Sequence, residues 1–163
     1  RRRAALSLAL ETLSLAVRRK LTHPNDKAGK PGGYRYASGC TTSCNAIGDI
    51  RQWWEEAGGK TQDFFNHVLG GPGLAPYYAE PWVCDKIVTN HLASPSMLCI
   101  LPLQDWLSID GDIRRDNPQD EQINVPANSR HYWRYRMHLT LEDLIGKAGF
   151  NQRIRDKVRA SGR

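Results

Sequence analysis

The sequence lacks several features that would place it in a specialised class of protein. None of its segments approaches the roughly 18 to 20 consecutive apolar residues that a membrane span requires. Arg1-Arg2-Arg3 leads into an apolar stretch that Glu11 interrupts, and no small-residue cleavage site follows, so we expect no secretory signal. Hydrophobic residues make up 40% of the 163 positions and charged residues 25%. These values exclude collagen-like, coiled-coil and low-complexity classes and indicate one soluble globular unit.

The four cysteines form neither a disulfide framework nor a zinc site. Cys40 and Cys44 have the spacing of paired zinc ligands, but no second pair completes a site. Cys99 lies in an apolar run, where a free thiol behaves as a small hydrophobic side chain. We therefore predict no metal, and the scattered reduced thiols favour a cytoplasmic protein.

The positive charge is not spread along the chain. The net charge is +6, but residues 1–36 hold nine Lys or Arg against two acidic residues, and residues 147–163 hold six against one. The centre, residues 37–146, is acidic, with eight basic residues against fourteen acidic ones. A nucleic-acid surface needs a contiguous basic stripe. A small basic nucleic-acid-associated protein is thus an alternative supported only by the two ends, and solvated helix faces explain them as well.

Hydrophobic periodicity and turn residues predict helices that alternate with short strands. Residues 2–11 are expected to form a helix, and strands are expected at 13–18, 35–42 and 97–103. The last is the clearest strand, because its apolar run is typical of strands buried on both faces of a parallel sheet. Further helices are predicted at 49–56, 61–69 and 80–92.

The C-terminal third begins with a long polar segment, residues 110–130, which we predict to be a loop with a functional role. Thr140 and Asp143 have the spacing of a capping box, which opens a helix. Phe150, Ile154 and Val158 then repeat at helical spacing in the last helix. This order indicates about three parallel β/α units, fewer than the eight of a complete barrel of about 250 residues.

Two long motifs resemble glycoside hydrolase family 77, the 4-α-glucanotransferases. Residues 94–108, Ser-Pro-Ser-Met-Leu-Cys-Ile-Leu-Pro-Leu-Gln-Asp-Trp-Leu-Ser, resemble the last barrel strand of that family. Residues 123–128 and 131–136 resemble the loop that follows it, closest to the longer amylomaltase-like branch that includes the plant cytosolic disproportionating enzyme. Residues 40–43, with Arg51 and the Trp-Trp-Glu-Glu of residues 53–56, resemble the seventh strand and its helix. Leu13-Ser14-Leu15 and Arg19 give a weaker match to the sixth strand.

The resemblance implies the fold and the chemistry. Family members are TIM barrels with the active site at the C-terminal ends of the strands. They transfer α-1,4-glucan units between maltodextrins by a retaining mechanism that uses an Asp nucleophile and a Glu acid/base. No dissociable cofactor is implied. Both carboxylates would lie upstream of Arg1, so we expect residues 1–163 to be one partial domain, the C-terminal part of the catalytic barrel, and inactive by itself.

A third family carboxylate, an Asp preceded by His, falls within this chain but is replaced. The family reads approximately Thr-Ser-Ser-His-Asp-Thr-Ser where residues 42–48 read Thr-Ser-Cys-Asn-Ala-Ile-Gly. Asn45 therefore stands at the His position and Ala46 at the Asp position. Asn45 could still hydrogen-bond a sugar hydroxyl, whereas Ala46 supplies no charge. Asp49 either substitutes for the lost carboxylate or is a helix N-cap or first-turn acid.

Other positions have both a binding and a structural interpretation. Asn124 matches a family Asn that contacts the sugar, or belongs to a plain loop turn. Gln104 and Asp105 end the last strand, where they would contact sugar, although Asp105 could cap the following segment.

Trp53 and Trp54 could stack on sugar rings, but adjacent helical residues face different sides, so we expect one in the core. The aromatic and arginine side chains of residues 131–136 are expected to fix the loop against the barrel.

The expected partner is an α-1,4-glucan or maltooligosaccharide, with no nucleic acid and no membrane; the sequence leaves the oligomeric state open. The alternative within the same family is a non-catalytic remnant or glucan-binding pseudoenzyme, which the replacements at Asn45 and Ala46 favour. Three strands would leave two open edges and an uncovered inner face. We therefore expect the isolated chain to be marginally soluble.

Overall fold

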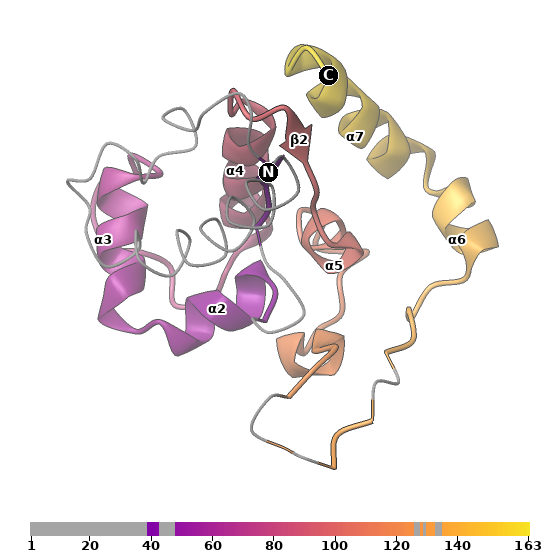
Figure 1. Ribbon diagram of the computed structural model, residues 1–163, viewed down its shortest axis with the longest axis horizontal. Helices are drawn as coiled ribbons and strands as arrows, with labels where there is room; N and C mark the ends of the chain where they lie inside the picture. Colours follow the sequence, from indigo (N-terminus) through magenta and orange to yellow (C-terminus); the bar gives the residue numbers. More distant parts are fainter. Residues whose placement is uncertain (1–38, 43–47, 126–127, 129, 133–134) are drawn as a thin grey trace, which may run out of the picture.

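The computed structural model describes residues 39–42, 48–125, 128, 130–132 and 135–163. Two short strands and seven helical segments follow one another along this part of the chain (Figure 1): β1 (Gly39–Cys40), α2 (Ile50–Glu56), α3 (Gly59–His67), α4 (Pro81–Leu92), β2 (Leu98–Cys99), α5 (Leu103–Leu107), the 3-10 turn η3 (Pro118–Glu121), α6 (Leu141–Gly146) and α7 (Ala148–Ala160). The helix predicted at 2–11, the strand at 13–18 and the first part of the strand at 35–42 lie outside the described residues.

The two strands pair in parallel, as predicted. Gly39 is opposite Leu98 and Cys40 is opposite Cys99. The backbone N–H of Ile100 extends the pairing by donating to the carbonyl of Cys40 at 2.9 Å. Helices α2, α3 and α4 form the connection between the strands, which is how parallel neighbours are joined in β/α folds.

The strand predicted at 97–103 is much shorter than expected. Only Leu98 and Cys99 are in strand conformation, and Leu103 already belongs to α5. Pro102 explains the early end, since it lacks the N–H that a ladder needs and stands at the N-cap of α5.

The predicted burial of this strand on both faces is also wrong. Leu98 is 46% exposed and Ile100 is 62% exposed, although Cys99 between Leu98 and Ile100 packs against the core. Within the described ranges β2 pairs with β1 alone. Its apolar side chains therefore lack the cover that further strands of a barrel would give.

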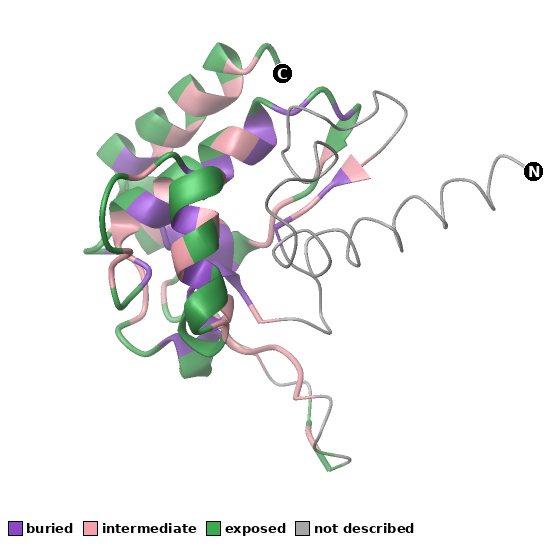
Figure 2. Ribbon diagram, turned by 90° about the vertical axis from the view of Figure 1, so that its left-hand side faces the viewer, coloured by how far each residue is buried: buried purple, intermediate pink, exposed green. Residues whose placement is uncertain are grey.

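The hydrophobic core lies among the helices, which gather on one side of the strand pair (Figure 2). Helix α4 contributes the largest set of core side chains, Val83, Cys84, Ile87, Val88 and Leu92. Trp54 of α2, Phe65 of α3 and Leu107 of α5 are buried in the same cluster. Phe150 attaches α7 to it, while Ile154 and Val158 are partly buried beside it, so the predicted apolar face of this helix is confirmed.

Local signals set the helix ends. Asp49 caps α2 by accepting from the N–H of Gln52 at 2.8 Å, and Pro81 occupies the first turn of α4, where its missing N–H costs nothing. The predicted capping box of α6 is present, with Thr140 and Asp143 bonded reciprocally. Helix α3 begins two residues earlier than predicted, after Gly58, whose φ of +53° suits glycine.

In the described part of the chain, no helix has the length and apolar character needed to cross a bilayer.

Candidate functional site

Asp105 lies at the centre of the contacts that join the two strands to the helices after them. Its side chain is completely buried. One carboxylate oxygen accepts from the N–H of Ile50 at 2.9 Å, and the other accepts from the hydroxyl of Thr42. Thr42 follows β1 and Ile50 begins α2, while Asp105 lies in the short helix after β2. Asp105 therefore connects the carboxyl ends of both parallel strands to the first turn of α2.

The same contacts flank the residues that the family resemblance singled out. Asn45 and Ala46 lie outside the described residues, between Thr42 and Gly48. Both described ends of this segment lie close to Asp105, because Thr42 bonds to it directly and Ile50 follows Gly48 by two positions. The carboxyl ends of parallel strands are where β/α enzymes place their active sites. We predict that Asn45 and Ala46 face this edge.

Gln104 and Asn124 are placed by the loop after α5. The side chain of Gln104 is buried and donates to the carbonyl of Glu121 at 3.5 Å. Asn124 follows three residues later and is half-buried. The His131 ring lies 2.9 Å from the carbonyl of Ile123, which fixes the loop beside Asn124. Gln104 thus lies next to the loop that carries Asn124, while sugar contacts by Gln104, Asp105 and Asn124 stay predictions.

Behind this edge is a buried polar cluster formed by Asp49, Arg51 and Glu121. Arg51 forms an ion pair with Glu121, with 3.4 Å between the guanidinium Nη1 and the carboxylate Oε2. The guanidinium also donates to the carbonyls of Arg115 at 2.5 Å and Asp116 at 2.8 Å. Arg51 therefore fixes the loop 115–121 against α2.

The two carboxyl groups of this cluster face each other. Among the described residues, no N–H or hydroxyl donor reaches Oδ2 of Asp49 or Oε1 of Glu121. Burial, and then the nearby charge of Asp49, raise the pKa of Glu121 to about 8, and the guanidinium of Arg51 opposes this rise without reversing it. Burial also raises the pKa of Asp49. Two carboxyl groups this close cannot both ionise, so the pair is expected to keep one proton. The protonated carboxyl would then donate a hydrogen bond to the ionised one.

The interpretation of Asp49 as an N-cap is confirmed. Its Oδ1 accepts from Gln52, and the residue is only 8% exposed. Its carboxyl group also interacts with that of Glu121 inside the protein. A carboxylate in this position stabilises the start of α2 and cannot reach a sugar without leaving its cap.

Trp53 and Trp54 both pack among the helices. Trp54 is 2% exposed and donates from Nε1 to the carbonyl of Pro76 at 2.9 Å, which confirms that one of the pair belongs to the core. Trp53 is half-buried, with its ring 5.3 Å from that of Phe64 in an edge-to-face contact. Both rings therefore have structural partners within the helical layer.

The strand cysteines interact with one another. A hydrogen bond from the thiol of Cys99 lowers the pKa of Cys40, whereas burial raises it. The hydrogen bond has the larger effect, so the pKa of Cys40 is lowered to about 6. The pKa of Cys99 is raised, chiefly by that same bond. Cys40, Cys84 and Cys99 are free thiols.

Within the described residues, no three His, Cys, Asp or Glu side chains gather to hold a metal ion.

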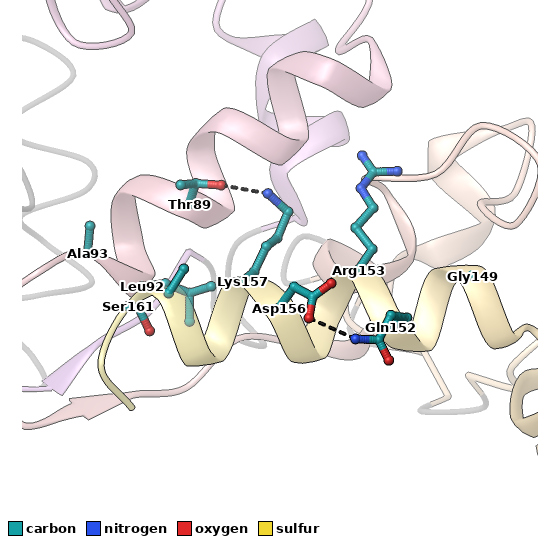
Figure 3. Close-up of a pocket in the computed structure, with 10 residues that line it drawn as sticks. Thr89, Leu92, Ala93, Gly149, Gln152, Arg153, Asp156, Lys157 and Ser161 are labelled. Carbon is teal, nitrogen blue, oxygen red and sulfur yellow. Dashed lines mark hydrogen bonds between the residues drawn. The ribbon is translucent and has the colours of Figure 1, made fainter.

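A groove lies away from this edge, between α4 and α7 (Figure 3). Its volume is about 660 Å³. Lys157 crosses it to Thr89 at 2.9 Å and to Asp85 at 2.7 Å, and Arg153 pairs with Asp85 at 2.8 Å. These ion pairs and hydrogen bonds join α4 to α7 along the groove.

Parallel strands joined through helices that cover one side define a segment of a β/α-type protein. A family model described as 4-alpha-glucanotransferase, glycoside hydrolase family 77, matches residues 4–141. The chain therefore belongs to this family, whose members are TIM-barrel enzymes.

Two curated relatives agree with this assignment. The 4-alpha-glucanotransferase DPE2 of Oryza sativa subsp. japonica is 36% identical over 154 residues, which cover 94% of this chain and 16% of the rice protein. The 4-alpha-glucanotransferase of Chlamydia caviae is 27% identical over 126 residues, covering 77% of this chain and 23% of that protein. The chain thus spans less than a quarter of the length of either relative.

Sequence reasoning missed the role of Glu121. It named Asp49 and matched Arg51 to the family, but it assigned residues 110–130 to a loop without a distinguished acid. An acidic residue in a polar loop gives no sign of burial. The nearest signal is Asn117-Pro118, since Asn117 caps the turn that brings Glu121 inward.

Proposed function

We propose that this chain forms the C-terminal part, about the last three β/α units, of the (β/α)8 catalytic barrel of a 4-alpha-glucanotransferase that transfers α-1,4-glucan units between maltodextrins. The family match over residues 4–141 is the observation that carries the proposal. The parallel pairing of β1 with β2 supports it, as does the position of Asp105 at their carboxyl ends. The reduced thiols of Cys40, Cys84 and Cys99 favour a cytoplasmic location.

In this proposal the reaction follows the retaining scheme. An Asp nucleophile and a Glu acid/base, about 5 to 5.5 Å apart, form and then hydrolyse or transfer a glycosyl-enzyme intermediate. The family positions of both residues lie outside residues 1–163. The chain by itself is therefore inactive on maltotriose, and its contribution is to bind and orient the glucan.

In the proposed site some residues of this chain contact the sugar and others hold those residues in position. In this proposal Asn45, Gln104 and Asn124 contact sugar hydroxyls. The hydrogen bond from Gln104 to the carbonyl of Glu121, three residues before Asn124, supports a common position for Gln104 and Asn124. Asp105 acts mainly as a positioning residue, because it fixes both ends of the segment that contains Asn45 and Ala46. Ala46 leaves the donor sugar without the carboxylate that would stabilise positive charge in the transition state.

The test is a chimera in which this chain replaces the matching part of the rice relative. Losing a preorganised charge costs on the order of a hundredfold in rate. Asn45→His with Ala46→Asp should therefore raise kcat for maltotriose disproportionation by about that factor, with a smaller effect on KM. Asp112→Asn, in an exposed loop, is the matched control and should leave kcat unchanged. Equal kcat with and without the two reversions would contradict the assignment of Ala46 to the lost carboxylate.

The second candidate is a glucan-binding pseudoenzyme, which Ala46 favours. It predicts glucan affinity in the unreverted chimera with turnover near background, and turnover that stays there after reversion. A nucleic-acid-associated protein is the third candidate. It predicts DNA binding that weakens steeply as salt concentration rises.

A further inference from the structure

The segment that connects α3 to α4 exposes a group of large side chains outside the candidate site. Leu74 is 89% exposed, Tyr77 is 82% exposed and Tyr78 is 58% exposed. The Tyr77 and Tyr78 rings make an edge-to-face contact, with centroids 4.8 Å apart and planes at 85°. Exposed aromatic side chains that gather in one place commonly mark a binding surface.

This segment is fixed by hydrogen bonds on both sides of the tyrosines. The Gln62 amide donates to the carbonyl of Gly73 at 2.9 Å and accepts from the N–H of Ala75 at 2.8 Å. The carbonyl of Pro76 accepts from Trp54, and that of Ala79 accepts from Arg114 at 2.7 Å. The tyrosines are therefore presented by an ordered backbone, which lowers the entropic cost of binding a ligand.

The tyrosines border a pocket between the C-terminal end of α2 and the start of α3. Its volume is about 540 Å³, within the range of small-molecule and oligosaccharide-sized sites. The lining residues are Trp54, Glu55, Gly58, Thr61, Gln62, Ala75, Pro76, Tyr77 and Tyr78. The pocket thus combines an aromatic wall with hydroxyl and carboxylate groups.

The charge of the lining selects the class of ligand. The lining contains no Lys or Arg, and its one acidic side chain is the exposed Glu55. A polyanion such as nucleic acid would be repelled. A pyranose ring fits this chemistry, because its C–H face packs on an aromatic ring and its hydroxyls donate to a carboxylate and to tyrosine oxygens.

We propose that the Tyr77–Tyr78 pocket is a second, non-catalytic binding site for an α-1,4-glucan chain. The choice of this sugar polymer rests on the proposed function. The pocket adjoins the C-terminal end of α2, whereas Asp105 contacts its N-terminal end. Seven helical residues separate the two ends by about 10 Å. A polymer held at the pocket is tethered to the protein, which raises its effective concentration at the other site.

The first test measures glucan binding by the full chain. Maltoheptaose affinity is determined by calorimetry, and retention by glycogen in native gels. The double variant Tyr77→Ala, Tyr78→Ala should bind about four- to hundredfold more weakly, because each lost aromatic contact weakens association by roughly two- to tenfold. Glu55→Gln should weaken binding by a smaller factor. Leu74→Ala is the control: it removes an exposed apolar side chain that does not line the pocket and should bind like the unaltered chain.

Unchanged affinity in the double variant overturns the inference, and so does an equal loss in Leu74→Ala. The substituted side chains are exposed, and circular dichroism checks that each variant keeps its helices. Maltotriose turnover by the reverted chimera should not depend on Tyr77 or Tyr78. Glycogen binding through the tyrosines without turnover contradicts the proposed function alone. Turnover with unchanged affinity in the double variant contradicts this inference alone.

Discussion

The carboxylate of Asp105 accepts a hydrogen bond of 2.9 Å from the backbone N–H of Ile50, 55 positions earlier in the chain. A first-turn N–H of a helix has no partner within the helix, so a buried carboxylate placed there satisfies it and interacts favourably with the helix dipole. The same carboxylate binds Thr42 after β1. One side chain thereby couples the start of α2 to the ends of both strands.

Asp105→Ala should lower the free energy of unfolding by about 3 kcal/mol. The substitution leaves the buried N–H of Ile50 and the hydroxyl of Thr42 without their acceptor. Urea denaturation of the chain measures the change. Asp105→Asn keeps one acceptor oxygen and should lose less than half as much. Asp112→Ala, in an exposed loop, should stay within about 0.5 kcal/mol. A loss at Asp105 no larger than at Asp112 would contradict the role assigned to this carboxylate.

Glu121 should make stability depend on pH. Its pKa is raised from 4.5 to about 8 in the folded chain by burial and by Asp49, so between these values the folded state binds more protons than the unfolded state. The contribution is therefore fully present below pH 4.5 and is lost as pH rises through about 8. The decline can reach about 1.4 kcal/mol per pH unit, the value for one proton.

Thermal unfolding between pH 5 and pH 9 measures this dependence. Glu121→Gln carries no titrating proton and should flatten the profile, while Glu142→Gln on the exposed face of α6 should leave it unchanged. The groups that face Glu121 are Asp49, Arg51, Arg115 and Tyr135. A profile equally steep in Glu121→Gln would show that another group is responsible.

Thr140→Ala should loosen α6 without unfolding the chain. Thr140 accepts from the N–H of Asp143 at 3.1 Å and completes a capping box, and none of the residues of α6 is buried. Its helical state therefore depends on local bonds more than on packing. Amide exchange across Leu141–Gly146 should accelerate about fivefold. Thr140→Ser keeps the hydroxyl and serves as the control; equal acceleration in both variants would exclude the cap as the cause.

Leu98→Thr with Ile100→Thr should reduce association of the chain. These side chains are 46% and 62% exposed beside the β1–β2 pair, where an apolar strand surface favours aggregation. Light scattering at increasing concentration should show a later onset in the double variant. Ile145→Thr removes a side chain that is 77% exposed on α6 and should change the onset little. A similar improvement from both would indicate general hydrophobicity and not the strand surface.

Much of the local structure could be read from the sequence. The helix starts at Asp49 and Thr140 and the apolar face of α7 follow from side chains within one or two turns, and the structure confirms them. The parallel relation of the last two strands was also predicted correctly. The length of the last strand was predicted wrongly. The whole apolar run 97–103 has the composition of a strand, and it is Pro102, which lacks a backbone N–H, that ends the strand early.

By itself, the sequence determined the family, through motifs that residues 94–108 and 123–136 carry, and the positions of the capped helices. The tertiary structure decided which polar groups are buried together. Glu121 meets Arg51 across 70 positions and Asp105 meets Ile50 across 55. Caps and amphipathic faces depend on neighbours a few residues away, so a linear pattern records them. Burial and proton sharing depend on which distant segments the chain brings into contact, and no local pattern contains that information.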